Sequence, residues 1–330
     1  MKKNVKDGLN TPYDSAFKSI IRKCPRMALY LINEMFYKNG LIEEHYSGRE
    51  RVVFLDKELP SLHRNSSVMD QRFTVYTDTS AHTFHLECES GKNGTIILRM
   101  IQYDTASALE QADYTVSRIR IKIDDSGILF LRSGRNTPGT MKVILEVPQN
   151  RSVSYRIPVI KMQDYSFDDI IEKKLFLLLP FIFFNYENQL KKISENKDGK
   201  RNIQSIYKAI INKLKNPTEA DDDGITAYEA SILYEAMQVV FDALAEKHEV
   251  KKEVAEIMGG EILVFSADKY FDAGKAEGIV EGKAKGIAEG EEMLGKLITM
   301  LITDGRSDEV AKAASDKEYR TLLYKDYAIS

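Results

Sequence analysis

The segment Phe84-His85-Leu86-Glu87-Cys88-Glu89-Ser90 decides the fold and the site predicted for this chain of 330 residues. Its apolar residues occupy positions 84, 86 and 88, and its polar residues lie between them. Side chains alternate between the two faces of a strand, so His85, Glu87 and Glu89 share one face. Burying carboxylates in a strand is costly unless they bind a partner. The segment therefore predicts a half-buried strand whose polar face forms a site.

A second strand is predicted over residues 70–76, because turn residues at 78–80 separate it from the first. A hairpin that closes around residues 78 and 79 places Asp70 opposite Glu87 and Arg72 opposite His85. The apolar residues of both strands then share the opposite face, and this agreement supports the register.

The predicted hairpin brings Asp70, Glu87 and Glu89 together in one patch. Carboxylate oxygens are the ligands that Mg²⁺ or Mn²⁺ prefers, so the patch is a candidate metal site. We expect His85 to be a structural ion partner of a neighbouring carboxylate. For Arg72 the same role and a contact to a phosphate both remain open.

The composition is that of an ordinary soluble globular protein, with 43% hydrophobic and 29% charged residues. Two cysteines exclude a disulfide framework and a four-cysteine zinc site, and they fit a reducing, cytoplasmic compartment. The polar start of the sequence does not resemble a secretory signal. The longest apolar run, residues 175–184, is about half a membrane span. We therefore expect buried core there and no membrane partner.

Charge is distributed unevenly along the chain. Residues 1–165 hold 24 Lys and Arg against 19 Asp and Glu, whereas the remainder holds 23 against 31. The first part is the one expected to face phosphates.

The first 165 residues predict a mixed α/β (α+β) domain. Helices are expected at 11–22, 27–37 and 95–109, and strands at 52–55, 70–76, 84–90, 127–132, 141–147 and 153–160. Thr11 and Pro12 begin the first helix, where Asp14 is either a capping carboxylate or an accessory acid of the site. Arg99 and Tyr103 share a face of the third helix. Residues 117–122 alternate basic with apolar, so Arg118, Arg120 and Lys122 lie on a solvated edge strand or a phosphate track.

The second half predicts long helices at 168–190, 201–214 and 226–257. An acidic linker at 219–224 separates the last two, and we expect a solvated connection there rather than a metal site. Glycines recur every fourth residue from 274 to 290, and a short helical module at 291–327, with its turn at Asp304-Gly305, follows. This organisation predicts three regions, 1–165, 166–270 and 271–330. The helical region or the glycine-periodic arm is the candidate contact for a homo-oligomer.

The chain resembles the PD-(D/E)XK nuclease superfamily, in its recombination-promoting nuclease and transposase-like branch, which is found in bacteria. The resemblance is carried by Asp14-Ser-Ala-Phe17-Lys18, Asp70, Glu87-Cys-Glu89-Ser90, Arg99 and Tyr103. It continues through residues 130–133, 136–138, 155–159, 161–165 and 179–181 and through the glycine-periodic tail.

The resemblance implies a restriction-endonuclease-like core that hydrolyses DNA phosphodiesters with Mg²⁺ or Mn²⁺. It implies Asp70 and Glu87 as metal ligands, with Asp14, Arg99 and Tyr103 as accessory residues and DNA as the partner. Glu89 is a departure, because the superfamily has lysine there and this branch commonly has glutamine. A glutamate could bind a metal or act as a general base. Lys92 is a candidate for the missing cation, against the alternative of an exposed turn lysine.

Two other functions compete with this hypothesis. A catalytically degenerate nuclease fold would act as a DNA-binding or protein-interaction module, and the Glu89 departure favours it. Alternatively, the helical second half and the glycine-periodic arm would serve protein interactions, with the acids exposed on a sheet edge.

Overall fold

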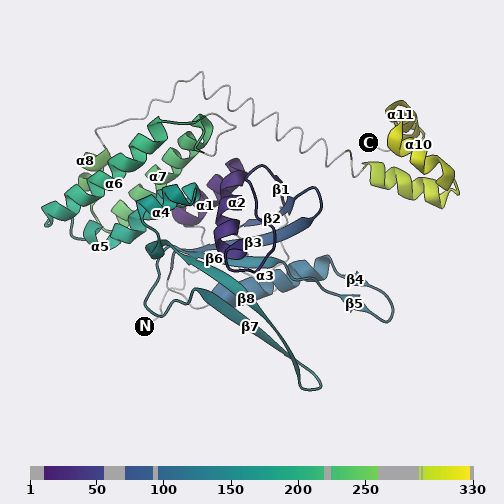
Figure 1. Cartoon of the computed structure of the whole chain (residues 1–330), viewed down its shortest axis with the longest axis horizontal. Helices are drawn as coiled ribbons and strands as arrows, with labels where there is room; N and C mark the ends of the chain where they lie inside the picture. The colour runs from purple at the N-terminus through teal and green to yellow at the C-terminus, as the bar shows by residue number, and fades with distance from the viewer. Residues whose placement is uncertain are drawn as a thin grey trace, which may run out of the picture. The chain divides into compact units, whose positions relative to one another are not determined.

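The structure is a computed structural model that describes residues 11–55, 71–91, 96–218, 224–258, 290 and 293–327. The chain divides into two compact units, residues 1–265 and 266–330. Figure 1 shows the elements of both units.

The strands of the first unit are β1 (Arg51–Phe54), β2 (Gln71–Tyr76), β3 (Ala81–Glu89), β4 (Asp113–Tyr114), β5 (Ile119–Arg120), β6 (Asp125–Phe130), β7 (Thr140–Val147) and β8 (Arg151–Lys161). Its α-helices are α1 (Pro12–Lys23), α2 (Pro25–Ile32), α3 (Ile96–Glu110), α4 (Phe167–Glu172), α5 (Glu187–Leu190), α6 (Lys197–Lys215), α7 (Ala227–Lys247) and α8 (Lys251–Met258). A π-helix, η1 (Asn33–Tyr37), continues α2, and η2 (Met162–Asp164) and η3 (Phe176–Tyr186) are 3-10 helices.

The described residues form a six-stranded sheet in the order β1-β2-β3-β6-β8-β7. β3, β6 and β8 run parallel to one another, and the remaining neighbours pair antiparallel. Helix α3 connects β3 to the parallel strand β6. The mixed α+β class predicted from the sequence is therefore confirmed.

The β2–β3 hairpin has the predicted register. Arg72 pairs with His85 and Phe73 with Phe84, around a turn at residues 77–80. The apolar pattern and the turn residues were sufficient to set this pairing. The predicted partner of Glu87, Asp70, lies outside the described residues.

Both faces of the sheet are covered by helices. On one face, Phe73, Phe84 and Leu86 join the large core made with α1, α2, η3 and α7. On the other face, Ile96 and Met100 of α3 pack against residues of β6, β7 and β8. His85, on the polar face of β3, bonds to Asp104 of α3, so this face is buried under α3, where the sequence predicted only a half-buried strand.

The predicted helix at 168–190 is wrong. The chain forms α4, then the 3-10 helix η3 and the short α5, with Lys174 in the left-handed region (φ 56°) after α4. Pro180 lacks the N–H that an α-helix interior needs. Residues 176–184 are all buried, so the run lies inside the core rather than presenting one face to it.

The other two predicted helices of this region are present, but their bounds differ from the prediction. Residues 201–214 lie within α6. The segment 226–257 forms two helices, α7 and α8. The chain turns between them at His248 and at Glu249, and Glu249 has a positive φ of 58°. The acidic linker at 219–223 lies outside the described residues. No helix in the described part of the chain is long and apolar enough to cross a membrane.

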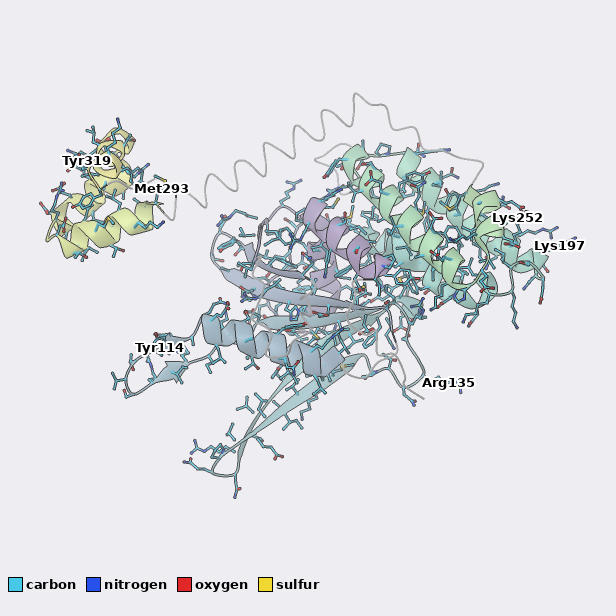
Figure 2. The ribbon with its side chains drawn as sticks, turned by 180° about the vertical axis from the view of Figure 1, so that it is seen from behind. Tyr114, Arg135, Lys197, Lys252, Met293 and Tyr319 are labelled. Carbon is cyan, nitrogen blue, oxygen red and sulfur yellow. The ribbon has the colours of Figure 1, made fainter. Side chains whose placement is uncertain are left out.

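Two pairs of strands project from the first unit as ribbons. β7 and β8 extend beyond the sheet, and β4 pairs with β5 in a separate two-stranded sheet after α3 (Figure 1). Figure 2 shows the β4–β5 ribbon at Tyr114, which is exposed. Residues 117–122 therefore do not form an edge strand of the main sheet.

The second unit is a small helical module. It contains a helical segment at 293–303, the 3-10 helix η4 (Ser307–Glu309), α10 (Val310–Ser315) and α11 (Lys317–Asp326). Leu297, Leu301, Ala313 and Leu323 form its core. Gly305 has a positive φ of 75° at the predicted turn. The glycine repeat lies outside the described residues up to Gly286, and only Gly290 of it is described.

Candidate active site at the end of β3

The carboxyl end of β3 places two glutamates beside a cation from α3. Glu87 and Glu89 are two residues apart and therefore share a face of the strand. Arg99 Nη2 lies 3.1 Å from Glu89 Oε2 and 3.7 Å from Glu87 Oε2. The side chain of Arg99 is 41% exposed, whereas that of Glu87 is 4% exposed. The guanidinium thus lies between the buried acids and the solvent.

Behind Glu87, a chain of hydrogen bonds runs into the interior. His85 Nε2 lies 3.0 Å from Glu87 Oε1, and His85 Nδ1 lies 2.7 Å from Asp104 Oδ1. Ser126 Oγ donates to Asp104 Oδ2 at 2.7 Å. Each of these four residues is buried. His85 is thus in contact with a neighbouring carboxylate, as expected, and also with a second one from α3.

The imidazole of His85 is held between two carboxylates. Burial alone would lower its pKa, but the hydrogen bonds to Asp104 and Glu87 outweigh burial and raise the pKa of His85 to about 10. The ring is therefore protonated at neutral pH and donates from both nitrogen atoms. A positive charge thus lies between the two buried acids.

Asp14 caps α1 and also lies near the two glutamates. Its Oδ2 accepts from the Thr11 N–H at 2.9 Å, and Thr11 Oγ1 accepts from the Asp14 N–H at 3.2 Å. Burial raises the pKa of Asp14 against the effect of these hydrogen bonds, and the charge of Glu87 raises it further. The capping alternative is therefore shown, and the same carboxylate lies close enough to Glu87 to interact with it.

The pKa of Glu89 is also raised. Burial is the main cause, and the charges of Asp14 and Glu87 add to it, whereas Gly91 and Arg99 act in the opposite direction. The backbone N–H of Gly91 donates to Glu89 Oε1 at 2.7 Å. The charge of Glu87 thus disfavours the ionisation of both Asp14 and Glu89.

The remaining predicted residues are distributed around this group. Arg72 forms a buried ion pair with Asp124, its Nε lying 2.7 Å from Oδ2. The Tyr103 ring meets that of His85 edge to face, with centroids 6.2 Å apart. Asp70 and Lys92 lie outside the described residues.

The predicted nucleic-acid residues Arg118, Arg120 and Lys122 are exposed and lie in or near the β4–β5 ribbon. Arg118 pairs with Asp113, its Nη2 lying 3.2 Å from Oδ2. The ribbon follows α3, the helix that carries Arg99 (Figure 1). Both residues of the Arg118–Asp113 pair are largely in contact with solvent.

Sequence reasoning missed Asp104. The buried face of α3 includes Ile96, Met100 and Ala108, and Asp104 occupies a position of the same helical repeat. A carboxylate at a core position of an amphipathic helix was the available signal. It indicates a buried partner, here His85.

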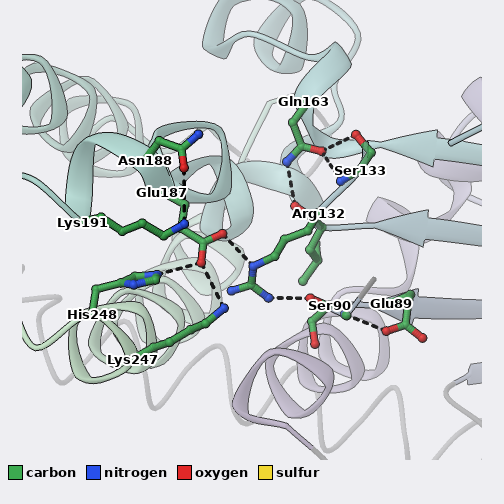
Figure 3. A network of polar contacts seen from close by, with 12 residues as sticks. Glu89, Ser90, Arg132, Ser133, Gln163, Glu187, Asn188, Lys191, Lys247 and His248 are labelled. Atoms are coloured by element: carbon green, nitrogen blue, oxygen red, sulfur yellow. Dashed lines mark hydrogen bonds and ion pairs between the residues drawn. The ribbon is translucent and has the colours of Figure 1, made fainter. Parts of the chain in front are cut away.

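A second polar network ties the end of β3 to the helical part of the unit (Figure 3). Arg132, just after β6, donates to the backbone oxygen of Ser90 and, at 2.7 Å, to Glu187 Oε2 on α5. Glu187 Oε1 accepts from Lys247 Nζ at 3.1 Å and lies 2.7 Å from His248 Nε2. The residue after Glu89 is thus fixed from the side of α5 and α7.

Among the described residues, no group of three or more His, Cys, Asp or Glu side chains is arranged to hold a metal ion. Asp70, the third acid of the predicted patch, is outside that set. Comparisons of the chain with protein-family models, with curated proteins and with solved structures gave no match.

Proposed function

We propose that the chain is a divalent-metal-dependent DNA endonuclease that hydrolyses phosphodiester bonds, with its active site at the carboxyl end of β3. The observation that supports this most is the position of Glu87 and Glu89, both within reach of the Arg99 guanidinium and near Asp14. A link to recombination or mobile elements comes from the sequence resemblance.

The charge of the site suits a hard cation. Among the described residues, three cations, His85, Arg99 and Lys18, act on the four acids Asp14, Glu87, Glu89 and Asp104, so the group carries more negative than positive charge when ionised. The raised pKa values of Asp14 and Glu89 reflect burial together with this crowding. A divalent cation bound by carboxylate oxygens would relieve the repulsion. Glu87 and Glu89, with Asp70 from the sequence prediction, are the proposed ligand set.

The side chains have distinct proposed roles. When bound, a divalent cation would supply Lewis-acid stabilisation of the phosphate charge. Glu89 would bind that cation or accept the proton of the attacking water, a role for which a raised pKa is suitable. Arg99 would stabilise negative charge on the phosphate, and so would provide the cation expected from a lysine at position 89.

Plasmid cleavage tests this proposal. Supercoiled DNA is incubated with the full chain in Mg²⁺, in Mn²⁺ and in excess EDTA. We expect cleavage only with a divalent cation, and a loss of at least about 100-fold in Glu89→Ala, which removes both the metal-binding oxygens and the proton acceptor. Asp78→Asn is the matched control, because Asp78 is an exposed acid in the turn of the same hairpin. Equal cleavage by Glu89→Ala and the wild type would exclude Glu89 from the reaction.

One observation favours a second function, a DNA-binding or protein-interaction module without catalysis. Glu87 and Glu89 already have charged partners within the chain, His85 and Arg99. Such pairing can stabilise the fold without any metal. This alternative predicts that gel-shift assays in EDTA detect DNA binding, while the same protein leaves DNA intact in Mn²⁺.

A further inference from the structure

We propose that His85 and Asp104 are positioning residues that orient Glu87 for metal binding, an inference that rests on the proposed function. His85 bonds to Oε1 of Glu87, so that the other oxygen, Oε2, is oriented toward the proposed metal ion. Asp104 acts through His85.

The geometry of the chain fixes the imidazole at both nitrogen atoms. Nδ1 bonds to Asp104 at 2.7 Å and Nε2 bonds to Glu87 at 3.0 Å, and the His85 side chain is fully buried. Asp104 is fixed in turn, because its second oxygen accepts from Ser126. Rotation of the imidazole would break a hydrogen bond in the interior, where it costs most. The ring therefore has one orientation.

Helix α3 acts on both oxygens of Glu87. Through Asp104 and His85 it holds Oε1, and through Arg99 it places a guanidinium 3.7 Å from Oε2. Oε2, the Glu87 oxygen that does not bond to His85, would then help to hold a cation. The two oxygens of the Glu87 carboxylate thus have different roles: Oε1 bonds to His85, and Oε2 would contact the metal ion.

The pair fixes a side chain that is almost wholly buried. The side chain of Glu87 is 4% exposed, and its Oε1 accepts from His85 on the interior side. Turning this carboxylate away would break a buried hydrogen bond. Partners that orient metal ligands in this way typically account for about 10- to 100-fold in metal affinity or activity.

The test measures Mn²⁺ binding by titration calorimetry and DNA cleavage kinetics on the full chain. We expect His85→Ala to weaken Mn²⁺ binding about 10- to 100-fold and to lower kcat while KM for DNA stays unchanged. His85→Gln should recover most of the affinity, because its amide can still donate to Glu87. Asp104→Asn, which keeps the size of the side chain, should give a smaller loss, of several-fold.

Thr74→Val is the matched control. Thr74 is buried in the same hairpin and its hydroxyl bonds to that of Thr83 at 3.0 Å, outside the hydrogen-bond chain that the described residues His85, Asp104 and Ser126 form. A purely structural role predicts that all these variants lower thermal stability and leave Mn²⁺ affinity unchanged. We expect that behaviour only for Thr74→Val.

The outcomes separate the two proposals. If the wild type binds Mn²⁺ and cleaves DNA, but His85→Ala and Asp104→Asn bind Mn²⁺ as tightly as it does, the positioning role is wrong and the proposed function stands. If His85→Ala fails to fold, unchanged affinity and kcat in Asp104→Asn overturn the positioning role. If the wild type binds no Mn²⁺, both proposals are wrong.

Discussion

Replacing Glu187 by glutamine should destabilise the first unit in a manner that depends on pH. Burial alone would raise the pKa of this carboxyl group, but hydrogen bonds from Arg132 and His248 outweigh burial and lower it to about 2 from 4.5. A lowered pKa in the folded state stabilises the fold above the pKa of the unfolded state, and this stabilisation is lost as the pH falls toward 2. The shift corresponds to about 3 kcal/mol at neutral pH.

Urea unfolding of the wild type and Glu187→Gln at pH 7 and pH 3 measures this effect. We expect a difference of about 3 kcal/mol in the free energy of unfolding at pH 7, decreasing steadily below pH 4.5. Glu235→Gln, an exposed position on α7, is the control and should change stability by less than about 0.5 kcal/mol. A difference that is the same at both pH values would refute the assignment of this energy to the charge of Glu187.

Three further variants test the packing, the capping and the buried charge. Phe183→Ala removes a fully buried ring that stacks on another at 4.2 Å, and calorimetry should show a loss of about 3–5 kcal/mol. Thr11→Ala removes the acceptor for the Asp14 N–H and should cost about 1 kcal/mol in urea unfolding; no change would mean that the cap contributes nothing. Glu87→Ala should cost about 3 kcal/mol, and clearly more than Glu87→Gln, because only the amide still accepts from His85; equal melting temperatures would contradict this.

The sequence predicted the parts of the fold that depend on local patterns. Alternation in 84–90 and the turn before it set the hairpin register, which the structure shows through the pairs Arg72–His85 and Phe73–Phe84. The Thr11 cap is likewise a contact within one helical turn. Such features need only neighbouring residues, so one sequence is sufficient to predict them.

Features that depend on distant contacts were not predictable in the same way. The polar face of β3 is buried because His85 packs against Tyr103 and Asp104 of α3, and nothing in residues 84–90 indicates that cover. Asp104 could be noticed at a core position, but its partner is 19 residues away. The helix predicted at 168–190 failed because residues 176–184 are buried on every side, which removes the helical period from the pattern.

The central claim is that the acids at the end of β3 serve metal-dependent DNA hydrolysis, and plasmid cleavage by Asp70→Ala tests it most directly. Cleavage rates are measured for the wild type, Asp70→Ala and the Asp78→Asn control, with Mn²⁺ and with EDTA. The proposal predicts Mn²⁺-dependent cleavage by the wild type and the control, and none by Asp70→Ala. Cleavage by Asp70→Ala at the wild-type rate, or intact DNA with a folded, DNA-binding wild type in Mn²⁺, would contradict it.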